Sequence, residues 1–143
     1  PARDILAMDG EFIHHFENVY HGVSAEGAAV IIRPGDIPWD KNYLQAILNR
    51  NIWIYLFVLQ MRFSLLQLSA TVDRAVFKRD IHEPEEPASL LERIGKIKFI
   101  CRYERVSHTT PINNFYRLCR NNLGITELLK EIDAAEKAII KII

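Results

Sequence analysis

The chain has 143 residues, of which 49% are hydrophobic and 25% are charged, which is the composition of an ordinary globular domain. Its 18 basic residues balance 18 acidic ones. This balance argues against a nucleic-acid-binding protein that works by neutralising phosphates, since such proteins usually carry a basic excess on one face. The two cysteines, Cys101 and Cys119, are too few for a disulfide framework or a four-thiolate zinc site, which favours a reduced, cytoplasmic setting.

Both ends of the chain indicate a fragment of a longer protein. The first residue is Pro1 rather than Met, and no signal peptide opens the sequence. The last helical pattern runs to Ile143 without a glycine or a polar cap. We therefore expect residues 1–143 to form a single domain that is joined to further segments in the parent chain.

Two proline-containing segments divide this domain. Residues 33–39 read R-P-G-D-I-P-W and residues 82–87 read H-E-P-E-E-P, and both patterns predict loops. The first loop separates a small N-terminal α/β portion, residues 1–38, from a helical portion, residues 39–143.

The N-terminal portion contains two predicted elements. Apolar residues at spacings of three and four predict a helix over residues 5–21, although Met8 to Gly10 interrupt the pattern. The apolar run G-A-A-V-I-I predicts a strand over residues 27–32, followed by a turn at Pro34.

A long apolar segment opens the helical portion. Residues 39–80 contain neither proline nor glycine and predict one long helix or two in tandem. The uninterrupted apolar run, residues 52–59, is shorter than the about 20 residues that cross a bilayer. Arg62 follows this run, and a central arginine costs about 2.5 to 3.5 kcal/mol in a membrane. The pattern favours a central helix buried by its neighbours over a transmembrane span.

Three further helices are predicted after the second loop. Ser89 with Glu92 forms a capping-box pattern before a helix that runs through Cys101. Pro111 predicts the first turn of the next helix, which Gly124 ends. Thr126 is the predicted cap of the last helix.

The last helix carries apolar residues at successive spacings of 3, 4, 3, 4 and 3, which is the pattern of a coiled-coil seam. Its members are Ile125, Leu128, Ile132, Ala135, Ile139 and Ile142. Two interpretations stay open: packing inside the chain, or self-association through Leu128, Ile132 and Ile139. The predicted fold class is mainly α, a helical bundle with a long central helix and a minor N-terminal β element, with α+β as the alternative.

The densest group of potential metal ligands lies near the N-terminus. On a helix, His14 and Glu17 share one face and Glu17 and His21 share another, so these three residues are the candidate metal ligands. No H-E-x-x-H motif is present, and a solvated helix face is the favoured interpretation. No cofactor is predicted.

Patterns for covalent catalysis and phosphate loops are missing from the sequence. Cys101 and Cys119 stand at apolar helical positions, which favours buried structural thiols over nucleophiles. The segment H-G-V-S-A-E-G, residues 21–27, lacks the lysine of a P-loop, and Ser24 lacks the glycine pattern of a nucleophile elbow. We expect a turn there, and no catalytic residue is assigned.

Four arginines in the C-terminal half alternate with tyrosines, a pattern that also occurs where proteins bind RNA or acidic lipid head groups. They are Arg102, Arg105, Arg117 and Arg120, with Tyr103 and Tyr116 between them. Glu104 and four asparagines interrupt the pattern, so a solvated face is favoured over nucleic-acid binding.

Residues 113–139 read N-N-F-Y-R-L-C-R-N-N-L-G-I-T-E-L-L-K-E-I-D-A-A-E-K-A-I. This stretch and the helix pair before it resemble the region that precedes the membrane helices of CorA-like proteins. The resemblance implies a cytosolic domain in which a small sheet feeds a long helix, attached to a membrane and assembled as an oligomer. The G-M-N signature of that family's pore does not occur in this chain, so ion transport is not implied for any residue.

The expected function is therefore a non-catalytic cytosolic assembly or regulatory domain of a larger, membrane-anchored bacterial protein. We expect a homo-oligomer, with attachment to the membrane through segments outside this sequence. Two alternatives from other classes stay open: a metal-dependent enzyme that uses the N-terminal histidines and carboxylates, and an RNA-binding module that uses the C-terminal arginines.

Overall fold

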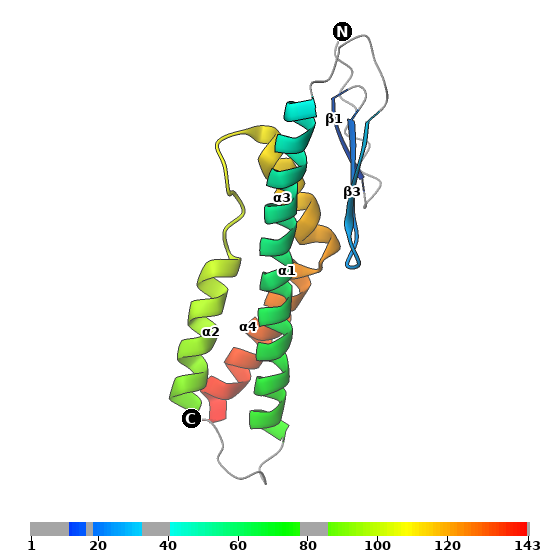
Figure 1. Ribbon diagram of the computed structural model, residues 1–143. Helices are drawn as coiled ribbons and strands as arrows, with labels where there is room; N and C mark the ends of the chain where they lie inside the picture. The colour runs from blue at the N-terminus through cyan, green and yellow to red at the C-terminus, as the bar shows by residue number, and fades with distance from the viewer. Residues whose placement is uncertain (1–11, 17–18, 33–40, 78–85, 143) are drawn as a thin grey trace. The chain divides into compact units, whose positions relative to one another are not determined.

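A computed structural model of the chain describes residues 12–16, 19–32, 41–77 and 86–142. The protein is mainly helical, with one long helix and a small antiparallel sheet near the N-terminus, as predicted (Figure 1). Its elements are, in chain order, β1 (Phe12–Phe16), β2 (Val19–Val23), β3 (Ala28–Ile32), α1 (Lys41–Phe77), α2 (Pro87–Cys101), α3 (Thr110–Asn122) and α4 (Ile125–Ile142).

The chain divides into two compact units, and each unit combines two separate stretches of sequence. The first unit consists of Pro1–Leu59 and Glu104–Leu123. The second consists of Gln60–Tyr103 and Gly124–Ile143. This division differs from the expected one at residue 38, because the sheet is completed by a helix that comes about 80 residues later in the chain.

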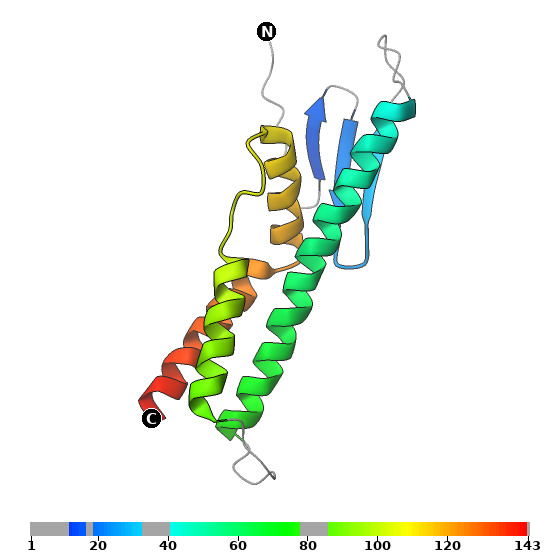
Figure 2. The same ribbon diagram turned by 60° about the vertical axis from the view of Figure 1, so that its left-hand side comes forward.

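The three strands of the first unit form one antiparallel sheet in the order β1-β2-β3 (Figure 2). The helix predicted for residues 5–21 is therefore wrong over its described part, which forms β1 and β2. In β2, Val19, His21 and Val23 are buried while Tyr20 and Gly22 are half-buried, a period of two. The same apolar residues also fit a spacing of three and four, and the branched and aromatic side chains favour the strand.

The segment between β2 and β3 is a tight turn, as predicted. The Ser24 backbone N–H donates a hydrogen bond of 2.8 Å to the Gly27 carbonyl, and this closes the hairpin. The strand that follows confirms the prediction for residues 27–32. Helix α3 packs on β1 and β2, and its Phe115 ring lies 5.5 Å from the ring of His21.

Helix α1 is one continuous helix of 37 residues, which confirms the first of the two predicted forms. A stripe of residues along one side of it is buried. This buried stripe consists of Ile47, Asn51, Val58, Met61, Leu65, Leu68 and Val72. The expectation that the neighbouring segments bury the whole helix is wrong, because many large apolar residues on its other sides are exposed.

The starts of α2 and α4 differ from their predicted caps. Helix α2 begins at Pro87 after Glu86, so Ser89 lies inside the first turn and is not the cap. Proline is well suited to a first helical position because its missing N–H has no partner there anyway. Helix α4 begins at Ile125, so Thr126 also lies inside its helix.

Gly124 makes the connection between α3 and α4 a very short one. Its φ of 68° lies in the left-handed region, which glycine adopts without strain. The Gly124 carbonyl accepts a hydrogen bond of 3.1 Å from the Leu128 N–H and so starts α4. The predicted end of the preceding helix at Gly124 agrees with this geometry, since α3 ends at Asn122.

In the second unit, α2 packs on α4 around a charged residue. Lys98 stands among the buried residues of α2, and its Nζ forms ion pairs with Asp133 and, at 2.5 Å, with Glu136 of α4. Burial by itself lowers the pKa of Lys98, but the hydrogen bonds to the two carboxylates outweigh it and leave the pKa raised. The hydrogen bond from Lys98 lowers the pKa of Asp133.

These shifts predict how the second unit responds to pH. The Asp133 carboxyl contributes stability above its ordinary pKa of 3.8, and this stability is lost as the pH falls through the lower folded value. The Lys98 ammonium contributes stability below its ordinary pKa of 10.5, which is lost as the pH rises through the higher folded value. The full contribution is therefore present between these two limits.

We expect Lys98→Met to lower the free energy of unfolding at pH 7 by about 1 to 2 kcal/mol, since it leaves two carboxylates without their shared partner. Urea unfolding at pH 7 and at pH 3 measures the effect, and the difference between variant and parent should shrink at pH 3. Lys96→Met is the matched control, because Lys96 pairs with Glu92 only on the exposed surface. Equal losses in the two variants would contradict the assignment.

Candidate functional site

The most distinctive surface feature of the described chain is a row of exposed apolar side chains on α1. The row lies on the side of the helix away from the buried stripe, since a residue advances 100° around an α-helix. All its members are exposed except Leu59, which is half-buried. The α1 row consists of Ile52, Leu56, Leu59, Phe63, Leu66 and Ala70.

The spacing of the α1 row is that of a coiled-coil seam. Its successive members are separated by 4, 3, 4, 3 and 4 residues. From Ile52 to Ala70 the row extends over about 27 Å at 1.5 Å per residue. The largest of its exposed side chains, Phe63, has 58% of its surface accessible. Isolated exposed apolar residues are common, but a continuous row of large ones on one helix marks an interaction surface.

Residues beside the α1 row carry little charge. Between Asn51 and Val72 the only charged residue is Arg62. Trp53, which at 73% is the most exposed of the large apolar residues that the structure describes, stands at the edge of the row, and Gln60 and Gln67 follow it at spacings of seven. The surroundings of the row therefore offer no charge pattern that selects an acidic or a basic partner.

At its N-terminal end the row borders a small apolar groove of the first unit. The groove has a volume of about 140 Å³ and lies between β3 and α1. Ala28 and Val30 line it from the strand, and Ile52 and Leu56 line it from the helix. Its volume is far below the about 300 to 1,000 Å³ of small-molecule sites, so it extends the apolar surface rather than forming a ligand pocket.

The predicted seam of α4 is largely covered within the chain. Ile132 and Ile139 have 1% and 5% of their surface exposed, and Leu128 is half-buried. This burial agrees with the interpretation in which α4 packs inside the chain, against α2. Self-association through these three residues stays a prediction, and it requires side chains that are already buried to become available.

The candidate metal ligands do not lie on a helix. His14 is in β1, where it pairs with Tyr20, and Glu17 lies outside the described residues. His21 is buried in β2, and its Nδ1 lies 3.1 Å from Nδ2 of the buried Asn51 on α1. Within the described part of the chain, no three His, Cys, Asp or Glu side chains gather as a metal site requires.

The four arginines fall into different environments. Arg120 is buried; its Nη1 donates to the Tyr116 hydroxyl at 3.3 Å, and its guanidinium lies 5.7 Å from the centre of the Tyr116 ring. Arg102 ends α2 in the second unit. Arg105 and Arg117 line the same pocket of the first unit. Only this last pair is thus brought together at a surface.

One segment of the described chain, Gln45–Val76 of α1, is long and apolar enough to cross a membrane, with a mean hydropathy of 1.4. Of its most apolar window, 22% is buried inside the protein. The core helices of soluble proteins meet the same criterion.

In comparisons with known proteins, no protein-family model, no curated protein and no solved structure matches the chain. The resemblance to CorA-like proteins therefore stands on the sequence pattern alone and stays a prediction.

Sequence reasoning missed the α1 row, although its spacing was visible. The residues on all sides of the segment 52–59 are apolar, so a single seam does not stand out from the sequence. The positions of Asn51, Arg62 and the other polar residues around α1 were the signal that could have separated the row from the rest of the helix.

Both cysteines are buried, as predicted. Burial raises the pKa of the Cys119 thiol to about 12, so at pH 8 its thiolate fraction is about 10⁻⁴. We expect a disulfide reagent that modifies free thiols to react at pH 8 with neither cysteine of the folded protein, and with both cysteines in urea. Cys101→Ser isolates Cys119, and modification of this variant without urea at the rate seen in urea would contradict the buried assignment.

Proposed function

We propose that the chain is a non-catalytic assembly domain that pairs with a second copy of itself through the α1 row. The observation that carries the proposal is the heptad spacing of six residues, five of them exposed, on one continuous helix. Heptad spacing fits the surface of another helix, because knobs from one seam enter holes of the facing seam.

A second copy is the partner that this row fits best. In a two-fold arrangement the same row supplies both sides of the interface. Leu56 and Phe63 would lie at the centre of this interface, where large apolar side chains contribute most to affinity. A partner selected by charge has little to bind here, since Arg62 is the only charged residue between Asn51 and Val72.

Pairing accounts for the exposed residues better than insertion into a bilayer. A helix that spans a bilayer alone exposes its whole circumference to lipid, where polar side chains are costly. The α1 side opposite the row carries Asn51, which is buried and bonded to His21. A helix partner covers the apolar row and leaves the buried stripe in place.

The CorA-like resemblance supports placing this domain at the cytoplasmic face of a membrane as part of an oligomer. In that setting the α1 pairing is one of the contacts that hold the soluble parts together. The sequence of the parent chain tests the membrane part of the proposal, and two apolar spans beyond residue 143 are the expected result.

We expect the wild-type domain to sediment as a dimer whose dissociation constant rises at least about tenfold with Phe63→Glu, since each copy would bury a charge in the interface. Leu56→Glu should have the same effect. Sedimentation equilibrium and light scattering measure the change. Phe99→Glu is the matched control, because Phe99 of α2 is exposed to a similar extent, 65%, and stands outside the row.

Three results would contradict the proposal. A wild-type monomer at the highest soluble concentration excludes a dimer through the row. Equal weakening by Phe63→Glu and Phe99→Glu indicates unspecific apolar association. Binding of the wild-type monomer to lipid vesicles, lost with Phe63→Glu, assigns the row to a membrane surface instead.

A further inference from the structure

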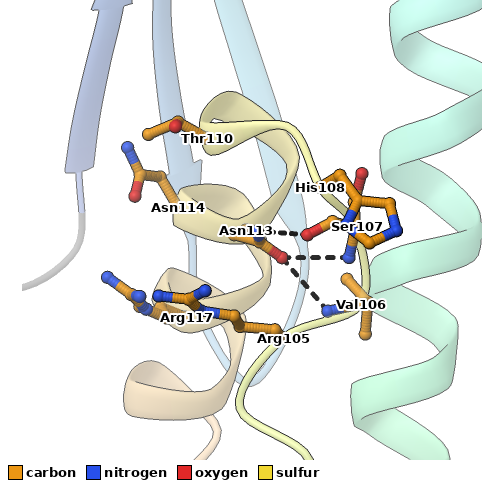
Figure 3. Close-up of a pocket in the computed structure, with 8 residues that line it drawn as sticks. All are labelled: Arg105, Val106, Ser107, His108, Thr110, Asn113, Asn114 and Arg117. Atoms are coloured by element: carbon orange, nitrogen blue, oxygen red, sulfur yellow. Dashed lines mark hydrogen bonds between the residues drawn. The ribbon is translucent and has the colours of Figure 1, made fainter.

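The first unit has a polar pocket where the chain enters α3. Its volume is about 800 Å³, and it is lined by the loop before α3 and by one side of the first turns of that helix (Figure 3). The lining includes two guanidinium groups, from Arg105 on the loop and Arg117 on α3. Among the residues that the structure describes, no carboxylate lines the pocket.

A buried asparagine holds the loop against the helix. Asn113 Oδ1 accepts hydrogen bonds of 3.1 Å from the backbone N–H groups of both Val106 and Ser107. Its Nδ2 donates to the Ser107 carbonyl at 2.5 Å. Figure 3 shows these three bonds fanning from one side chain to the loop. The loop is thereby fixed on α3, so Arg105 is presented from a defined position next to the helix.

The two arginines face the same side of the pocket. In Figure 3 the side chains of Arg105 and Arg117 extend in the same direction, and Thr110 and Asn114 stand on that side of α3 above them. Thr110, Asn114 and Arg117 are spaced by four and three residues, which places them in one row along the helix.

Within the part of the chain that the structure describes, no carboxylate pairs with the positive charges of this pocket. Neither Arg105 nor Arg117 forms a hydrogen bond or an ion pair with another part of the chain where the structure is described. The contrast is Arg120 on the same helix, which is buried and bonded to Tyr116. Two like charges that line one pocket repel each other, and an anion between them removes that repulsion.

We propose that this pocket binds the phosphate group of a small soluble ligand, held by Arg105 and Arg117. Each guanidinium offers five N–H donors in a planar fork that binds phosphate or carboxylate oxygens in pairs, and a phosphate has three free oxygens to share between two such groups. Thr110 and Asn114 supply neutral donors beside the guanidinium groups. The pocket volume leaves room for an organic part of the ligand, as in other small-molecule sites.

The test uses inorganic phosphate and phenyl phosphate as probes, with acetate as a carboxylate comparison, in calorimetric and NMR titrations of the wild-type domain. We expect saturable binding of both phosphates, tighter for phenyl phosphate, and no saturable binding of acetate. Arg105→Gln and Arg117→Gln should each weaken phosphate binding at least about tenfold, the effect of losing a charged hydrogen bond. Arg117→Lys should fall between wild type and Arg117→Gln.

Lys130→Gln is the charge-matched control, because it removes one positive charge from an exposed position on α4 outside the pocket. Unchanged binding in this variant supports the site, while a loss equal to that of Arg117→Gln indicates an unspecific charge effect and overturns it. Failure of phosphate to saturate the wild-type domain also overturns it. Tighter binding of a short single-stranded RNA than of phenyl phosphate, with a steep salt dependence, assigns the arginines to RNA instead.

Discussion

The buried stripe of α1 is the constraint on which both units depend. Its N-terminal members, including Ile47 and Val58, belong to the core of the first unit, and its C-terminal members, including Leu65 and Leu68, belong to that of the second. Because a helix turns by 100° per residue, burying this stripe leaves the residues on the far side exposed. The fold of the chain therefore exposes the α1 row on the side of the helix away from the buried stripe.

The parts of the fold that the sequence predicted well are those with one strong signal. The long helix was predicted from the absence of proline and glycine, and the turn before β3 from a segment that contains glycine. The helix end at Gly124 was predicted because glycine suits a positive φ. Each pattern has a single physical interpretation. The β1–β2 hairpin was missed because its apolar residues satisfy the helix and the strand period equally. The helix starts at Pro87 and Ile125 were missed because backbone geometry, and not a side-chain cap, determines them.

The functional features divide in the same way. Heptad spacing in α4 was visible from the sequence, but whether such a seam packs inside the chain depends on contacts with α2, which sequence spacing does not contain. Arg105 and Arg117 come to line one pocket because the Asn113 side chain holds the loop that carries Arg105 against the helix that carries Arg117. Arg105 and Arg117, which are 12 residues apart in the sequence, thereby line one pocket. Arg120 is instead buried and donates a hydrogen bond to the Tyr116 hydroxyl.

The interleaved construction of the two units has a consequence for synthesis on the ribosome. The sheet belongs to the first unit, yet α3, which packs on it, emerges only when residues 110–122 have been translated. Until then the hairpin lacks the cover that Phe115 gives to His21, and the second unit waits still longer for α4. A nascent or truncated chain that ends before residue 104 therefore contains neither unit complete, and it exposes apolar surface that chaperones bind. Each unit is therefore completed only when its later stretch, residues 104–123 or 124–143, has been synthesised.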